Sequence, residues 1–282
     1  MSTTIRNRFT GILSGWDASI IEHYQLKHSV TTITAARDAY QKEPDLPALF
    51  GELFGKIEAN MNSDPKASIG TSNWELRPAL EIIDHNESLE KRLEKRIVHL
   101  AEEPRKGSPL SGWYNQIPAA SGYASPTSNR KNSIDLVYEI ECSKEYEIIE
   151  LKVDNKSGTP FYAAYENLSY GFLYLLTRTH NRLRQIFAEA LVKPILAAKK
   201  VQLVILAPDS YFDANRKFSF ELKRFEETFD AALRDFAKSK VPGLEMGFEF
   251  RQFSNPVSSR EKVESFKGFE PGPCGERVPF QA

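Results

Sequence analysis

The sequence predicts an α/β fold of the α+β type, in which a central mixed sheet is flanked by helices and follows a helical N-terminal region. Two adjacent runs of apolar and β-branched residues, 133–141 and 146–153, are joined by a short polar turn and indicate a β-hairpin. A continuous apolar run at 201–207 is typical of a buried strand, and apolar stripes at helical spacing lie on both sides of it. Together these patterns favour helices packed on a sheet.

The composition is that of an ordinary globular protein. The chain has 282 residues, 41% of them hydrophobic, and a formal net charge of -1. This charge argues against an overall basic nucleic-acid coat but leaves room for a local basic groove. Cys142 and Cys274 form neither a disulfide framework nor a zinc pattern, so a reducing, cytoplasmic location is expected. No apolar run approaches the ~18 residues of a membrane span, and no signal-peptide core follows the first residues.

Residues 1–72 are expected to form a helical N-terminal region. Apolar stripes at helical spacing run through the first 60 residues, and Pro44 and Pro47 divide them into at least two helices. The polar segment 62–73 reads as a linker. Because no chemistry-bearing pattern is present here, the expected role is a subdomain or an interface, for example in a homodimer.

Residues 73–253 are expected to form the main domain, which begins with a helical pattern from Trp74 onward. A break at His85 or Asn86 leaves a helix expected over 87–103.

The next segment, 104–132, is rich in Pro, Gly, Ser and Asn, and its strand-like piece is 113–117. It is either a surface loop or a loop that closes over a site. In the second case Arg130 and Lys131 would contact a backbone phosphate of a substrate.

The second half of the chain alternates helices and strands. Thr159-Pro160 begins a helix expected over 160–190, and an amphipathic helix at 217–239 precedes a strand at 246–253. Residues 254–282 are expected to be an extended tail. Three residues near the end of the first of these helices could form a phosphate-facing edge: His180, Arg182 and Arg184.

The hairpin carries charged residues at positions that share a face. If Ser143-Lys144 is a two-residue loop, Asp135 falls opposite Lys152, and side chains that alternate along a strand place Glu150 on the same side. Burying a Glu and a Lys in an apolar strand is costly unless they are paired or bind a cation. The alternative is a surface hairpin with a solvated cross-strand pair.

At these residues the chain resembles the PD-(D/E)XK nuclease superfamily. Asp135 matches the Asp of the motif, and Glu150-Leu151-Lys152 matches (D/E)XK, while Ile134 stands where the motif has Pro. The helix, three antiparallel strands, helix and strand of the restriction-endonuclease-like core match the expected order over roughly residues 80–207. The resemblance implies a divalent-metal phosphodiesterase.

The resemblance also implies roles for individual residues. Asp135, Glu150 and the carbonyl of Leu151 would hold Mg²⁺, or Mn²⁺, and Lys152 would position the attacking water. Near a cation and low-dielectric walls, the Lys152 ammonium is expected to lose its proton more easily than that of a free Lys. The first helix of the family often adds a Glu, for which we select Glu90.

Other residues of the two helices are weaker candidates. Glu94 is the reserve for Glu90, with Glu87 as a third choice, and the alternative is a solvated, salt-bridged helix face. Three residues line one face of the helix after the hairpin and are assigned to substrate binding: Tyr162, Glu166 and Tyr170. Some family members carry Gln-x-x-x-Tyr there, and Glu166 departs from it by replacing Gln. The alternative is that these aromatic residues are core.

The expected function is a metal-dependent nuclease in a restriction, defence or repair role, acting on DNA rather than RNA. The alternative is a nuclease fold without activity that serves as a nucleic-acid-binding or assembly module, which the near-neutral charge favours.

Overall fold

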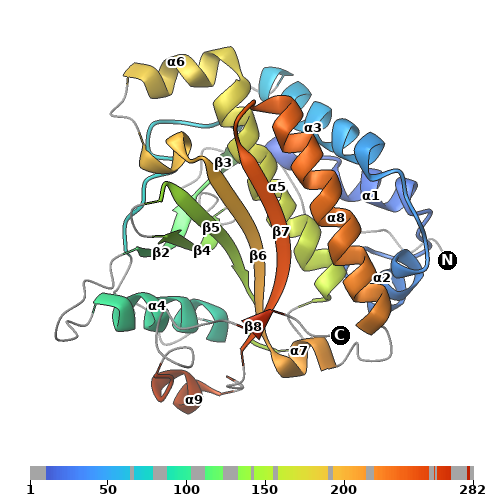
Figure 1. Cartoon of the computed structure of the whole chain (residues 1–282), viewed down its shortest axis with the longest axis vertical. Helices are drawn as coiled ribbons and strands as arrows, with labels where there is room; N and C mark the ends of the chain where they lie inside the picture. The colour runs from blue at the N-terminus through green and yellow to red at the C-terminus, as the bar shows by residue number, and fades with distance from the viewer. Residues whose placement is uncertain are drawn as a thin grey trace.

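The structure is a computed structural model of the 282-residue chain. The residues that it describes are 11–63, 67–78, 88–102, 112–122, 133–140, 143–154, 158–189, 193–213, 219–253, 257, 259–267 and 278–279. Within them the chain forms a mixed sheet with helices on both faces (Figure 1). This confirms the predicted fold class at the level of a mixed sheet flanked by helices.

The strands of the main sheet lie in the order β2-β4-β5-β6-β7-β8. Strands β2, β4 and β5 are antiparallel, β5, β6 and β7 are parallel, and β8 is antiparallel to β7. Their bounds are Trp113–Pro118, Ser133–Ile140, Glu145–Leu151, Lys200–Pro208, Glu245–Phe253 and Val278–Pro279. A separate ladder pairs β1 (Ala67–Ser68) with β3 (Ser121–Gly122). The five strands predicted from the sequence are present.

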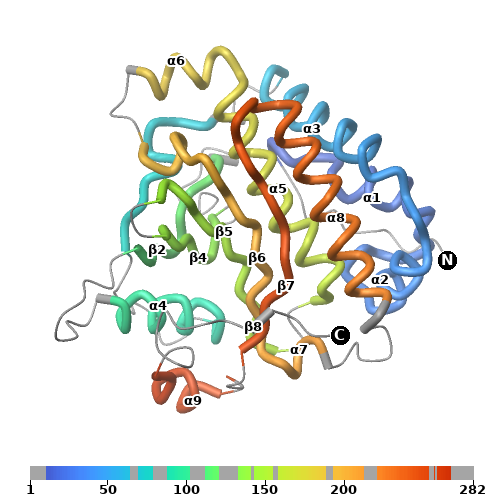
Figure 2. The backbone as a smooth tube through the Cα atoms, viewed as in Figure 1, coloured from blue at the N-terminus to red at the C-terminus, as the bar shows by residue number. Residues whose placement is uncertain are grey.

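Helices cover the two faces of the sheet in different ways. α5 (Pro160–Thr179) and α8 (Ser219–Lys240) pack on one face and form the crossovers that parallel neighbours require. α4 (Leu89–Glu102) packs on the other face, where its Leu93 and Ile97 meet apolar residues of β4 and β5. Figure 2 shows α4 on the far side of the sheet from the helices near the N-terminus.

The N-terminal helices share the core of α5 and α8. Their bounds are Gly11–Leu13 for η1, Trp16–His23 for α1, Ile33–Tyr40 for α2 and Leu46–Ser63 for α3. The ring of Phe50 in α3 lies edge-on to Phe172 of α5 at 5.6 Å and to Phe229 of α8 at 5.2 Å. The predicted helical character of this region is therefore confirmed. Among the described helices, none combines the length and apolar character needed to cross a membrane.

Residues 71–78 form turns and irregular chain instead of the helix predicted from Trp74. Trp74 takes a positive φ of 59° because tertiary contacts hold it. Its backbone N–H donates to the Pro118 carbonyl at 2.9 Å, and its indole N–H donates to the Thr177 hydroxyl at 3.1 Å. These long-range bonds override the local helical pattern, and α4 begins only at Leu89.

Two further segments differ from the prediction. The single helix expected over 160–190 is two helices, α5 and α6 (Asn181–Glu189), because His180 between them is extended with ψ 123°. The tail expected to be extended contains α9 (Arg260–Glu264) and β8. Val263 and Phe266 are buried in the core on the α4 side, which explains why this part of the tail is ordered into a helix.

Carboxylates of α8 anchor this helix to β7. Glu226 accepts the Phe250 N–H at 2.6 Å, and Asp230 accepts the Phe248 N–H at 2.7 Å. Burial raises the pKa of Glu226 to about 7, although the Phe250 N–H opposes this shift. The folded chain holds the Glu226 proton more tightly than the unfolded chain. Protonated Glu226 therefore contributes fully to the free energy of unfolding below about pH 4.5, and this contribution is lost as the pH rises through 7.

We expect Glu226→Gln to remove this pH dependence, because an amide oxygen can accept the same hydrogen bond without titrating. The variant should match the parent in free energy of unfolding near pH 4.5 and exceed it at pH 8 by up to roughly 3 kcal/mol. Urea denaturation at both pH values measures the difference, with Asp235→Asn at an exposed position of the same helix as control. A gain that is equal at both pH values would contradict the assignment.

Candidate functional site

The β4–β5 hairpin places the three motif residues together, with a register that differs from the predicted one. Leu136 pairs with Ile149 and Ile140 with Glu145, so Asp135 is level with Glu150 and not with Lys152. The turn is therefore longer than the predicted two residues. Because the register differs by two positions, an even number, every side chain keeps the face that the sequence predicted.

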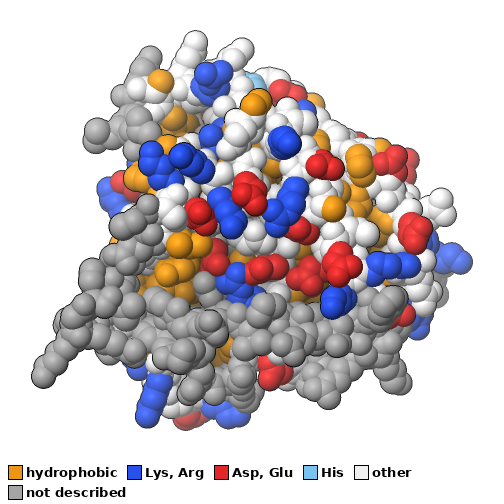
Figure 3. Space-filling view, viewed as in Figure 1, with side chains coloured by type: hydrophobic (Ala, Val, Ile, Leu, Met, Phe, Trp, Pro, Cys, Tyr) orange, Lys and Arg blue, Asp and Glu red, His pale blue; other side chains and the backbone are white. Residues whose placement is uncertain are grey.

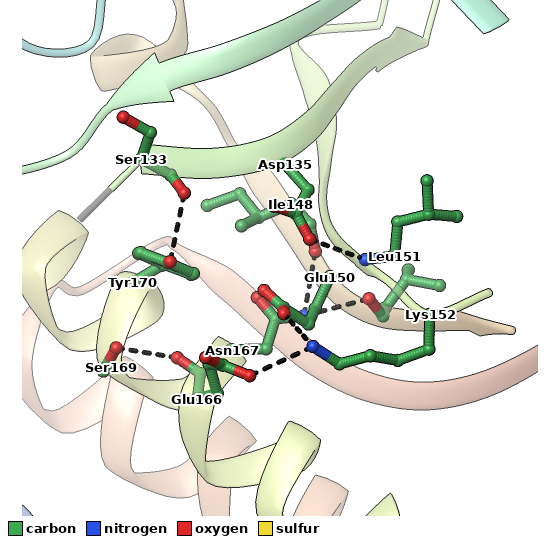
Figure 4. Close-up of polar contacts among 11 residues, drawn as sticks. Ser133, Asp135, Ile148, Glu150, Leu151, Lys152, Glu166, Asn167, Ser169 and Tyr170 are labelled. Carbon is green, nitrogen blue, oxygen red and sulfur yellow. Dashed lines mark hydrogen bonds and ion pairs between the residues drawn. The ribbon is translucent and has the colours of Figure 1, made fainter. Parts of the chain in front are cut away.

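Asp135, Glu150 and Lys152 lie on the face of the sheet that α5 covers, and Figure 4 shows them gathered there. Lys152 is buried, and its ammonium forms ion pairs with Glu150 and with Glu166 of α5, the latter at 3.1 Å. The Asp135 carboxylate accepts a hydrogen bond from the backbone N–H of Leu151, the residue after Glu150, at 3.0 Å. The hairpin and α5 thus build one buried charged cluster.

The carboxylates of this cluster outnumber its ammonium group. Burial raises the pKa of Glu150 well above its usual value, and the charges of Asp135 and Glu166 raise it further, against the opposing effect of Lys152. Burial also raises the pKa of Asp135, with Lys152 and the Leu151 N–H opposing. Negative charge on these groups is therefore costly unless further positive charge is supplied.

The prediction that Lys152 deprotonates easily applies to a site that holds a cation, and without one the pKa of Lys152 moves in the opposite direction. Burial alone would lower its pKa, but the carboxylates of Glu150 and Glu166 outweigh burial, and the pKa is raised well above that of a free Lys. The expectation assumed a cation beside Lys152, whereas its described neighbours are anions. Lys152 is therefore a fixed ammonium here, which donates hydrogen bonds and supplies charge.

Helix α4 brings two of its predicted carboxylates toward the cluster. Glu94 is buried, and burial followed by the charge of Asp135 raises its pKa well above the usual value. Glu90 is partly buried, and its charge acts on Lys152. The charge of Asp135 thus acts on the reserve candidate, Glu94, although α4 covers the opposite face of the sheet. Three candidates lie outside the described residues: Glu87, Arg130 and Lys131.

The predicted residues of α5 fall into two groups. Glu166 is part of the cluster through Lys152, and Tyr170, one turn later, donates its hydroxyl hydrogen to the Ser133 carbonyl at 3.1 Å. Burial raises the pKa of Tyr170 well above its usual value, and the charge of Glu150 adds to this. Tyr162 is buried in the first turn of the helix, one turn before Glu166.

Asn167 fixes α5 to the sheet and was missed by sequence reasoning. Its side chain is fully buried, and its amide nitrogen donates to the Ile148 carbonyl of β5 at 3.1 Å and to the Val204 carbonyl of β6 at 3.0 Å. Because Glu166 is the preceding residue, this bridge also sets where Glu166 stands against Lys152. A single Asn within an apolar helical stripe is the signal that would have revealed it.

Gln116 and Tyr211 are two further residues that the sequence did not reveal. Gln116 in β2 has a φ of 53°, is level with Asp135, and forms a side-chain hydrogen bond to Glu94. Such a left-handed residue within a strand stores strain beside the cluster. Tyr211 lies in α7 (Asp209–Asp213) and is buried. Burial raises the pKa of its hydroxyl, and the charges of Lys152 and Glu166 also act on this pKa.

The oxygens of the cluster fit a hard cation in chemistry. One oxygen of Glu150 and one of Glu94, Oε2 in each, are buried with no hydrogen-bond partner among the described residues. Carboxylate oxygens of this kind are the ligands that Mg²⁺ prefers. Within the same part of the chain, no three His, Cys, Asp or Glu side chains stand ready as a complete metal site. The donors are present, while the Lys152 ammonium engages the other carboxylate oxygen of Glu150.

Comparison with protein families, curated proteins and solved structures finds no match to this chain.

We expect Asn167→Leu to destabilise the fold, because it leaves the Ile148 and Val204 carbonyls without their donor. The cost should be about 2–4 kcal/mol in the free energy of unfolding, measured by urea denaturation. Ser169→Ala is the matched control, since among the described residues this hydroxyl bonds to the Glu166 carbonyl within α5, at 2.7 Å, and its loss should cost less than about 1 kcal/mol. Equal stabilities for the two variants would show that Asn167 does not anchor the helix.

Proposed function

We propose that this chain is a metal-dependent nuclease that hydrolyses phosphodiester bonds, with DNA as the preferred substrate over RNA. The observation that carries the proposal is the charged cluster in which the buried Glu150 and Lys152 share one face of the hairpin with Asp135. Buried charges are retained at a cost to stability, and a site that needs them for chemistry is the usual reason.

The order of elements supports the same proposal. α4, β2, β4, β5, α5 and β6 follow one another as helix, three antiparallel strands, helix and strand, with β6 parallel to β5. This is the order expected for a restriction-endonuclease-like core of the PD-(D/E)XK type. The hairpin strands that carry the charged cluster hold the central positions in it.

In the proposed mechanism, Asp135, Glu150 and the carbonyl of Leu151 are the residues that would hold Mg²⁺ or Mn²⁺. When bound, such an ion would supply Lewis-acid stabilisation of the phosphoryl oxygens and a more acidic water. Lys152 contributes a fixed ammonium that orients water and offsets the charge developing on the phosphate. Glu166 holds that ammonium in place at 3.1 Å, and Tyr170 closes the α5 side of the cluster.

A second candidate is a nucleic-acid-binding or assembly module that keeps the fold without catalysis. Lys152 favours it, because both of its carboxylate partners already engage the ammonium. The formal net charge of -1 agrees with a protein that does not rely on strong electrostatic attraction to nucleic acid. A cleavage assay on plasmid, single-stranded DNA and RNA, with Mg²⁺, Mn²⁺ or EDTA, separates the two candidates.

We expect Asp135→Asn and Glu150→Gln each to abolish Mg²⁺ and Mn²⁺ binding in calorimetry and to abolish cleavage. Both changes keep the shape of the side chain while removing the charge that attracts the cation. Glu145→Gln is the matched control, because this residue is on the same strand but pairs with Lys200 at 3.7 Å. Unchanged metal affinity in both site variants would rule out the proposed ligands.

For Lys152→Met we expect turnover to fall by about 10²-fold or more, with DNA affinity in Ca²⁺ nearly unchanged. Lys152→Arg tests the role of the group, since guanidinium keeps the charge but cannot release a proton. Partial activity in the Arg variant is expected if Lys152 acts as a fixed charge, and circular dichroism checks that each variant folds. A parent protein that binds DNA and cuts no substrate with either metal would establish the binding module.

A further inference from the structure

A second group of cations lies at the opposite end of α5 from Lys152. Arg178 occupies the last turn of α5, and α6 carries Arg182 and Arg184. Figure 3 shows Lys and Arg side chains over the part of the surface where α6 and the start of β6 lie. Arg178 lies twelve positions after Glu166 on α5, which is about 18 Å along the helix axis. This region is therefore separate from the candidate nuclease site.

A cavity of about 590 Å³ opens between α5 and α6 in this region. Its described lining residues are Thr177, Arg178, Asn181, Arg184, Gln185, Phe187, Ala188 and Leu196. Two guanidinium groups and two amides thus face a wall of apolar side chains, and no Asp or Glu is among the lining residues that the structure describes. The volume falls in the range of small-molecule sites, roughly 300–1,000 Å³.

The guanidinium of Arg178 is held in place before any ligand binds. Its Nη1 donates to the Tyr174 hydroxyl at 2.9 Å and to the Ala198 carbonyl at 2.8 Å, and the group lies 5.6 Å from the centre of the Tyr174 ring. Both hydrogen bonds are donated by Nη1, so they fix the plane of the Arg178 guanidinium without using its other two nitrogens. Arg184 is exposed and has no ion-pair partner in the described part of the chain.

We propose that this cavity binds a nucleoside phosphate, either a free nucleotide or the phosphorylated end of a nucleic-acid strand. Arg178 and Arg184 would bind the phosphate, because guanidinium groups match its oxygens in geometry and charge. The base would lie on the apolar wall that includes Phe187 and Leu196, and the amides of Asn181 and Gln185 supply hydrogen bonds to its edge. The inference does not rest on the proposed nuclease activity.

The test is calorimetric binding in EDTA, which removes any contribution of a metal site. Adenosine monophosphate, adenosine, inorganic phosphate and a short 5′-phosphorylated oligonucleotide are the probes. We expect the monophosphate to bind more tightly than adenosine or phosphate alone, and Arg184→Glu to weaken it at least about tenfold. Arg182→Glu is the matched control, since this exposed residue makes the same charge change on α6 but does not line the cavity.

A second variant separates the cavity from its charge. Ala188→Trp on the exposed wall should fill the space and reduce binding without altering the net charge. Binding of the phosphorylated oligonucleotide but not of the monophosphate identifies a strand end as the ligand, and the reverse identifies a free nucleotide. The proposal is overturned if no phosphate probe binds, if inorganic phosphate binds as well as the monophosphate, or if Arg182→Glu and Arg184→Glu weaken binding equally.

Discussion

The burial of the Lys152 ammonium between Glu150 and Glu166 is the constraint on which the arrangement of the core depends. A buried ammonium must keep both its charge partners and its hydrogen bonds. If α5 rotated or slid on the sheet, Lys152 would lose its ion pair with Glu166, and a buried charge without its partner is strongly destabilising. Asn167 also fixes the position of α5 on the sheet, because its side-chain amide donates to one backbone carbonyl of β5 and one of β6. Glu166 and Asn167, which are consecutive in α5, thus hold the Lys152 side chain and the two strands β5 and β6.

The cluster keeps more negative charge than its ammonium can neutralise. Burial raises the pKa of Asp135 and of Glu150, and apolar residues in place of such a cluster are often neutral or stabilising. Gln116, strained at a φ of 53°, adds to the cost in the same place. Natural proteins retain such local costs where activity requires them, and the rest of this chain compensates with a large aromatic core that joins α3, α5 and α8.

The sequence was sufficient for the strands and for the face of the hairpin that Asp135, Glu150 and Lys152 share, because alternation is a local property that a register error of two residues does not change. The register itself depends on the turn, whose length the sequence left open. Trp74 could not be predicted, because bonds to residues distant in the chain set its conformation. Without a cation, the pKa of Lys152 is raised first by Glu150, which the motif already placed beside it, and then by Glu166, whose position on α5 the sequence could not supply.

The parallel pairing of β5 with β6 has a consequence for how the chain folds as it is synthesised. The β4–β5 hairpin closes between residues that are near in sequence, whereas the Lys152 N–H must wait for the Leu206 carbonyl, which follows α5, α6 and η2 (Pro194–Ala197). On a nascent chain the two hairpin strands are therefore the first to be available for pairing, while their charged face is still in water. The charges become buried only after α5, which carries Glu166, and then β6, which carries Leu206, have followed the hairpin out.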